Sequence, residues 1–200
     1  MSRKKGAIMN ENIIIYGGAF NPPTIAHLEI GKFIRKKFPD KKLIYLPTNN
    51  YYNKDLLASF EDRVNMLELI IKKLDDNVSI SSYELENDSY KGTYYTLKHF
   101  NNPYFVIGAD SLETLPTWIN GKKLIEENKF IVFPRSGYNV NEIINKNQVL
   151  LDNYNHFVII DENEFSKSDV SSSAFRYEND ESVLIEEVKE YIKLKGLYRC

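Results

Sequence analysis

The sequence predicts an α/β protein with a doubly wound parallel sheet flanked by helices and a small helical part at the C-terminal end. Three observations lead to this class. Apolar runs of strand length alternate along the chain with amphipathic segments of helix length. The first run, Ile13 to Tyr16, is apolar throughout, as in a strand buried on both faces of a parallel sheet. Two glycines follow that run directly, as expected where a strand turns tightly into a helix.

Six strands are predicted from short runs of β-branched, aromatic and other apolar residues. They are expected at residues 13–16, 43–46, 78–83, 104–107, 130–133 and 157–160. Amphipathic helices are predicted between them, and the clearest apolar stripes lie within residues 25–38, 64–74 and 183–192. Ser59 is the expected N-cap of the second of these helices, with Asp62 three residues later. This alternation corresponds to a Rossmann-like order of elements.

Length and composition predict a single domain. The 200 residues, of which 42% are hydrophobic, suffice for one well-packed α/β domain, which we assign to residues 13–200. Residues 1–12 are polar and lack the apolar core of a secretion signal, so we expect a disordered leader. The net charge of −2 shows no excess of basic residues of the kind that binds nucleic acid. No apolar run approaches the length needed to span a membrane. The single cysteine, Cys200, excludes a disulfide framework and fits a reducing cytoplasm.

The turn after the first strand is the strongest candidate for a functional site. Gly17 and Gly18 permit unusual backbone geometry or a close approach that a Cβ would hinder. A helix is expected to begin near Thr24, so its free N–H groups and positive dipole end face the carboxyl edge of the sheet, where an anion could bind. His27 shares a helix face with Thr24. An ordinary strand–turn–helix joint, with a capping Thr and a surface His, explains the spacing equally well.

The motif "GGAFNPPTIAHL" resembles the signature of nucleotidyltransferases that have a T/H-x-x-H motif after a G-x-F-x-P turn. Further segments resemble the nicotinate/nicotinamide-mononucleotide adenylyltransferases in particular. These segments are "PTNNYYNKDLLASFEDRVNML" at 47–67, "FVIGADSLETLPTWINGKKLIEENKFIVFPRSGY" at 105–138, "VSSSAFR" at 170–176 and "EEVKEYIKLKGLY" at 186–198. Together they cover nearly the whole chain. The resemblance implies one nucleotidyltransferase domain that joins ATP to a pyridine mononucleotide in NAD biosynthesis and releases pyrophosphate.

The resemblance also implies the roles of residues around the phosphates. His27 would contact ATP phosphates and stabilise charge at the reacting phosphate, with the hydroxyl of Thr24 beside it and Arg176 adding a positive fork. Mg²⁺ would arrive with ATP, held mainly by phosphate oxygens and water, so no dedicated metal site is expected in the protein. The full set implied to bind ATP is Gly17, Gly18, Ala19, Phe20, His27, Gly108, Asp110, Ser171, Ser172 and Arg176.

A second group is implied to bind the remainder of the two substrates. Asp110 follows Gly108 after a predicted strand and would accept hydrogen bonds from ribose hydroxyls, although an acid there also suits the N-cap of a helix. The residues implied to bind the mononucleotide are Asn50, Lys54, Thr93, Trp118 and Arg135, and the last two would line its pyridine side. The family often forms dimers or larger assemblies, so the resemblance leaves a homo-oligomer open.

Two departures affect the choice of substrate. The usual bacterial form has His at the position of Thr24, whereas Thr24 and the loop around Lys54 are similar to the eukaryotic type, which often accepts both the acid and the amide mononucleotide. The segment from Trp118 to Arg135 resembles the bacterial form. We therefore expect use of both mononucleotides, with nicotinate mononucleotide preferred.

Two alternatives remain open at this stage. Threonine also stands at the position of Thr24 in phosphopantetheine adenylyltransferases, although the Trp118 region and the C-terminal helix do not suit that enzyme. The other alternative is a catalytically inactive relative that acts as a nucleotide-binding sensor.

Overall fold

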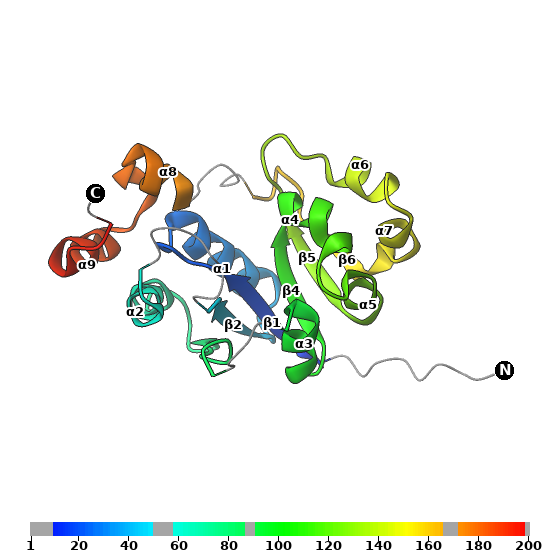
Figure 1. The fold of residues 1–200 in the computed structure, drawn as a ribbon, viewed down its shortest axis with the longest axis horizontal. Coiled ribbons are helices and arrows are strands. Elements are labelled where there is room, and N and C mark those ends of the chain that lie inside the picture. Colours follow the sequence, from blue (N-terminus) through cyan, green and yellow to red (C-terminus); the bar gives the residue numbers. More distant parts are fainter. Residues whose placement is uncertain (1–9, 50–57, 87–90, 166–171, 199–200) are drawn as a thin grey trace. The chain divides into compact units, whose positions relative to one another are not determined.

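The computed structural model describes residues 10–49, 58–86, 91–165 and 172–198 (Figure 1). The chain forms two compact units. Unit 1 joins Met1–Tyr16 to Lys91–Ser166, and unit 2 joins Gly17–Tyr90 to Lys167–Cys200.

Unit 1 contains most of the parallel strands. Strand β1 (Asn10–Gly18) pairs with β4 (Pro103–Gly108), β4 pairs with β5 (Lys129–Phe133), and β5 pairs with β6 (Phe157–Ile159). Ile14 and Ile15 of β1 are fully buried, as the uniformly apolar run predicted. In the chain, β2 and β3 lie between β1 and its partner β4. The order of the strands therefore changes direction at β1, which is typical of a doubly wound sheet.

The connections of unit 1 are short helices (Figure 1). They are α3 (Thr93–His99), α4 (Ala109–Thr114), α5 (Gly121–Glu127), α6 (Val140–Asn145) and α7 (Gln148–Asp152), with 3₁₀ turns η1 (Leu115–Thr117) and η2 (Tyr154–His156). Each α-helix buries apolar side chains, including Leu97, Leu112, Leu124, Ile144 and Leu150.

Unit 2 begins with the turn after β1. It contains α1 (Ile25–Lys37), β2 (Lys42–Pro47), α2 (Phe60–Ile71), β3 (Val78–Ile80), α8 (Ser172–Glu178), η3 (Glu181–Val183) and α9 (Glu186–Lys195). Strands β2 and β3 pair in parallel. One apolar core joins the early helices to the C-terminal ones, because Leu28 of α1, Met66 and Ile70 of α2 and Val188 and Ile192 of α9 are buried in a single cluster.

The structure confirms the predicted α/β class and corrects several boundaries. Strand β1 begins at Asn10, so residues 10–12, which we assigned to the leader, belong to the strand. Strand β3 ends at Ile80, because a turn follows in which Leu85 N donates to Ser82 O. The third predicted stripe is divided: Val183 lies in η3, and α9 begins only at Glu186.

Ser59 is the N-cap of α2 as predicted, with its hydroxyl accepting from Asp62 N at 3.0 Å. Within the described ranges, no helix is both long enough and apolar enough to cross a membrane.

Candidate active site

The turn after β1 is built around Phe20, which occupies the left-handed region at φ 46°. Its buried ring meets the His27 ring edge-on, with 5.0 Å between ring centroids, and lies 5.6 Å from the ring of Tyr45. A Cβ on Gly18 would lie 3.2 Å from Phe20 Cζ. Gly18 is therefore explained by this close approach and not by unusual backbone geometry, since neither Gly17 nor Gly18 has a positive φ.

Thr24 and His27 form a capping box at the start of α1. Thr24 is the N-cap, and its backbone N–H donates to His27 Nδ1 at 2.8 Å. Thr24 Oγ1 lies 2.8 Å from the same nitrogen. Because Nδ1 accepts a hydrogen bond from the backbone, a neutral His27 carries its proton on Nε2. The cap thus fixes the tautomer of the ring, with the proton on Nε2. The prediction of a capping Thr is confirmed, and the histidine is part of the same cap.

A tyrosine from β2 fixes the same turn of α1. Tyr45 is fully buried and its hydroxyl donates to His27 O at 2.8 Å. Gly31, one turn further along α1, makes this approach feasible, because a Cβ there would overlap the Tyr45 hydroxyl. A glycine inside a helix costs about 1 kcal/mol of stability relative to alanine. Gly31 within the apolar stripe is therefore a sequence signal of close packing at this position.

Three side chains from two later helices hold the carbonyl oxygens of the turn. Arg63 Nη1 of α2 donates to Ala19 O at 2.7 Å. Arg176 Nη1 of α8 donates to Asn21 O at 2.5 Å, and Ser172 Oγ donates to Pro22 O at 2.8 Å. The structure therefore brings Ser172 and Arg176, two of the predicted ATP-binding residues, to the turn that leads into His27. Arg63 was not among the predicted site residues.

Asn21 connects this turn to the C-terminal segment. Its side chain is buried, and Asn21 Oδ1 accepts from Ala58 N at 3.1 Å and from the Tyr198 hydroxyl at 2.6 Å. Burial raises the pKa of Tyr198, although Arg63 and Arg176 nearby act in the opposite direction. Tyr198 is therefore a neutral donor at physiological pH. We call Asn21, Tyr198, Arg63 and Arg176, with the turn that they hold, the turn cluster.

In unit 1, Asp110 and Arg135 lie at the ends of β4 and β5. Arg135 Nε lies 3.8 Å from Asp110 Oδ1, and both side chains are partly exposed. Gly108 leaves room for this pair, because a Cβ on it would overlap the Asp110 carboxylate and lie 3.4 Å from Arg135 Cγ. Asp110 lies in the first turn of α4, whose N-cap is Gly108. The N-cap alternative for Asp110 is therefore wrong by two positions.

Tyr16 of β1 lies close to the same ion pair. Burial raises its pKa, Arg135 acts against that rise, and Asp110 adds to it. Sequence reasoning assigned Asp110 to a ribose and Arg135 to the pyridine side. The two side chains adjoin, and their assignment to different substrate groups stays a prediction.

Trp118 and Thr93 belong to neighbouring segments of unit 1. Trp118 is only half-buried, and its Nε1 donates to Thr114 Oγ1 at 3.1 Å. Gly92, which precedes Thr93, has a φ of 100°, and a Cβ on it would lie 2.9 Å from Cβ of Ile119. The segments that carry the two predicted mononucleotide contacts therefore meet through Gly92 and Ile119.

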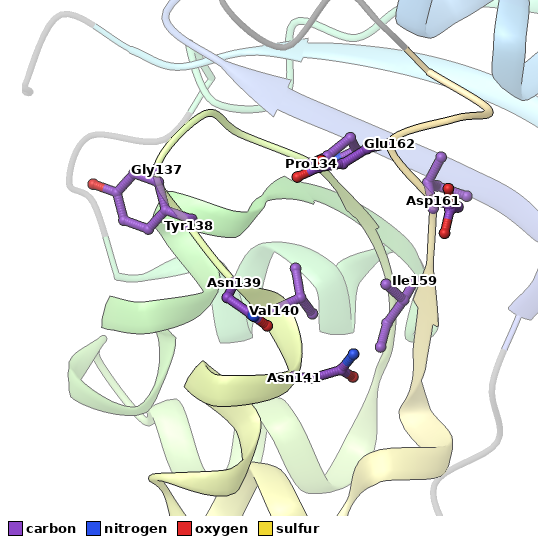
Figure 2. A pocket seen from close by; sticks show the side chains of 10 residues that line it. Pro134, Gly137, Tyr138, Asn139, Val140, Asn141, Ile159, Asp161 and Glu162 are labelled. Atoms are coloured by element: carbon purple, nitrogen blue, oxygen red, sulfur yellow. The ribbon is translucent and has the colours of Figure 1, made fainter.

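A hollow of about 490 Å³ lies beyond the ends of β5 and β6 (Figure 2). In Figure 2, Asn139, Val140 and Asn141 line one side, and Ile159 and Asp161 line the other. Asp161 and Glu162 make this hollow unfavourable for phosphate.

Three predicted site residues, Asn50, Lys54 and Ser171, lie outside the described residues. In the part of the chain that the structure describes, no three His, Cys, Asp or Glu side chains are grouped so that they could hold a metal ion.

Residues 15–178 match the family model described as cytidylyltransferase-like. A protein of Acholeplasma laidlawii named "Probable nicotinate-nucleotide adenylyltransferase" is 37% identical over 193 residues, covering 93% of this chain and 97% of that protein. A protein of Clostridium acetobutylicum with the same name is 34% identical over 200 residues, covering 92% of this chain and 97% of the relative.

A solved structure titled Plasmodium falciparum nicotinic acid mononucleotide adenylyltransferase complexed with NaAD has a TM-score of 0.74. The likeness covers 94% of this chain and 98% of that chain at 24% sequence identity, and it confirms the fold. The chain belongs to the cytidylyltransferase-like family, a class of α/β proteins. Within that class it belongs to the nicotinate-nucleotide adenylyltransferases, as its motifs predicted.

Proposed function

We propose that the chain transfers the adenylyl group of ATP to nicotinate mononucleotide in NAD biosynthesis. A phosphate oxygen of the mononucleotide attacks the α-phosphorus of ATP, the bond from that phosphorus to the bridging oxygen breaks, and pyrophosphate leaves. The capping box carries the proposal, because it holds the Nε2–H of His27 as a fixed donor at the start of a helix. The names of the relatives support the choice of substrates.

Both reactants are anions, so the protein has to offset their repulsion and hold them in line. His27 Nε2–H and the N-terminal end of α1 supply positive potential toward the phosphates. Arg176 has further N–H donors beyond those that bind Asn21 O and Ser173 Oγ, so it can also contact phosphate. Thr24, Ser171, Ser172 and the backbone of residues 17–20 complete the proposed phosphate contacts.

Asp110 is proposed to accept hydrogen bonds from the ribose of ATP, next to Gly108. Trp118 and Arg135 are proposed to line the pyridine side, with Asn50, Lys54 and Thr93 contacting the rest of the mononucleotide. Mg²⁺ bound to the ATP phosphates would neutralise part of their charge. The ion is proposed to arrive with ATP.

The proposal extends to location and partners. A cytoplasmic location agrees with an enzyme of nucleotide metabolism and with a single cysteine. Nucleic acid and membranes are not expected as partners, and a homo-oligomer is left open.

The test is the formation of pyrophosphate from Mg-ATP in separate incubations with nicotinate mononucleotide, nicotinamide mononucleotide and phosphopantetheine. We expect product with both pyridine mononucleotides, a higher kcat/KM for the acid, and none with phosphopantetheine. A mismatched buried polar group costs about 1–3 kcal/mol, so the preference should be on the order of tenfold to a hundredfold. Product with phosphopantetheine alone would place the chain in that branch, and no product with any acceptor would favour a nucleotide sensor.

Two variants test the proposed orientation of ATP. Arg176→Ala should slow the chemical step, whereas Asp110→Asn should mainly raise the KM for ATP, because ribose contacts are similar in the ground and transition states. Exchanged phenotypes would mean that the nucleotide binds the other way round.

A further inference from the structure

Arg63 is a charged side chain in the interior of unit 2. It lies in the first turns of α2 and is fully buried. Its guanidinium bridges two segments that are far apart in the sequence: Nη1 donates to Ala19 O and Nη2 donates to Thr48 O, both at 2.7 Å. Ala19 belongs to the turn after β1, and Thr48 directly follows β2.

The two segments bridged by Arg63 also bind each other. Thr48 N donates to Gly18 O at 2.9 Å. The three hydrogen bonds close a ring that passes through Gly18, Ala19, Arg63 and Thr48. In such a ring, a shift of either segment lengthens at least one hydrogen bond. The guanidinium therefore fixes the position of the turn after β1 relative to the end of β2.

This arrangement is costly for stability alone. Burial lowers the pKa of Arg63, which means that the charged form loses hydration free energy in the fold. The guanidinium gains two carbonyl acceptors and lies 5.3 Å from the centroid of the Phe60 ring. An apolar residue in its place would leave Ala19 O and Thr48 O without these donors. The buried planar fork therefore holds two carbonyl oxygens at fixed positions.

The position that Arg63 sets is the one that matters for the reaction. Ala19 O is one residue away from Phe20, whose ring packs on His27. Asn21, the next residue, is held by Arg176 and Tyr198. Arg63 thus closes the turn cluster on the side of β2 and supports the His27 ring through Phe20.

We propose that Arg63 is a positioning residue for adenylyl transfer, which places the turn after β1, and through it His27, by bridging Ala19 O and Thr48 O. This inference rests on the proposed function. Lysine cannot replace arginine here, because a single ammonium group lacks the planar fork that reaches two fixed carbonyls.

The experiment compares Arg63→Lys with Arg35→Lys. Arg35 is the matched control: it is also a buried arginine of unit 2 and also binds loop carbonyls, but those belong to the connection from α1 to β2. Unfolding midpoints, kcat and both KM values are measured at a temperature where circular dichroism shows each variant folded. ATP affinity is measured by titration calorimetry, which needs no turnover.

We expect both variants to lose comparable stability. Only Arg63→Lys should lose activity, by about tenfold to a hundredfold in kcat, because a misplacement of about 1 Å can cost that much. ATP affinity of Arg63→Lys should fall less than its kcat. If Arg63→Lys does not fold, Arg63→Met takes its place in the same comparison. Equal kcat values for the Arg63 and Arg35 variants in an active wild-type background would overturn the inference, whereas a wild-type chain without turnover would overturn the proposed function instead.

Discussion

Arg63 and Arg35 are two buried arginines of unit 2 that hold opposite ends of β2. Arg35 of α1 donates to Phe38 O at 3.0 Å, Pro39 O at 2.6 Å and Lys41 O, and its Nε lies 2.9 Å from both carboxylate oxygens of Asp75. Its charge is therefore shared with a carboxylate. Arg63 donates to two neutral carbonyl oxygens, Ala19 O and Thr48 O, at the carboxyl end of β2. The turn that contains Ala19 leads to His27.

The comparison separates stability from positioning. At the amino end of β2, Arg35 closes a connecting loop and offsets its own charge with Asp75, which contributes to the free energy of unfolding. At the carboxyl end, where doubly wound sheets bind ligands, Arg63 holds a turn with a functional side chain. Arginine thus stabilises the fold at the amino end of β2 and positions a turn at its carboxyl end.

The largest effect should come from His27 itself. His27→Ala is expected to lower kcat by roughly a hundredfold to a thousandfold, because one preorganised donor to the developing charge is lost. Stability should fall by about 1 kcal/mol, since the capping box is lost as well. Steady-state kinetics and urea unfolding measure the two. His99→Ala, an exposed position of α3, is the control. A folded His27→Ala protein with wild-type kcat would leave His27 with a capping role alone.

Replacing Arg35, at the amino end of β2, should lower stability and leave kcat nearly unchanged. Arg35→Met leaves loop carbonyls and Asp75 without their donor, and we expect a loss of about 2–3 kcal/mol in the free energy of unfolding. Asp75 is half-exposed and can be rehydrated, which limits the loss. Urea midpoints give the free energy, and kcat at a temperature well below unfolding should stay within about twofold. A kcat as low as that of Arg63→Lys would remove the distinction between the two ends.

A smaller effect is expected from Tyr198→Phe, which removes one of the two donors to Asn21 Oδ1. The expected loss is about 0.5–1.5 kcal/mol in stability, with a reduction of kcat of only a few-fold, because Ala58 N still holds Asn21. Tyr191→Phe is the matched control, since that hydroxyl of α9 binds Asp62 and Asn65 of α2. If both variants lower kcat equally, the C-terminal contacts of the turn cluster do not position it.

The smallest effect concerns pH. The hydrogen bond from Arg35 lowers the pKa of Asp75 below its usual range. Because the folded-state pKa is the lower one, this carboxylate contributes stability above the unfolded pKa of about 4, and the contribution is lost as pH falls through the folded pKa. Its size should be about 1 kcal/mol or less, since the carboxylate is half-exposed.

Urea unfolding of wild type and Asp75→Asn at neutral and acidic pH checks this expectation. The difference in free energy of unfolding should be present at pH 7 and shrink below about pH 4. A difference that is independent of pH would mean that Asp75 does not share the charge of Arg35.

The amino-acid sequence by itself determined the α/β class, the six strands, the start of α1 at Thr24 and the family. These features rest on local patterns: apolar runs of strand length, a capping residue, and motifs whose spacing is fixed along the chain. The Ser59 cap of α2 follows from the same kind of information, because its partner Asp62 is only three residues away.

Only the tertiary structure decided how the turn after β1 is held. Its partners Arg63, Arg176 and Tyr198 come from α2, α8 and the C-terminal segment, and no local pattern predicts which carbonyl oxygen a distant side chain will reach. The adjacency of Asp110 and Arg135 likewise arises from two strands that pair only after folding. The physical reason is that hydrogen bonds depend on distances of a few tenths of an ångström, and packing of the whole unit sets those distances.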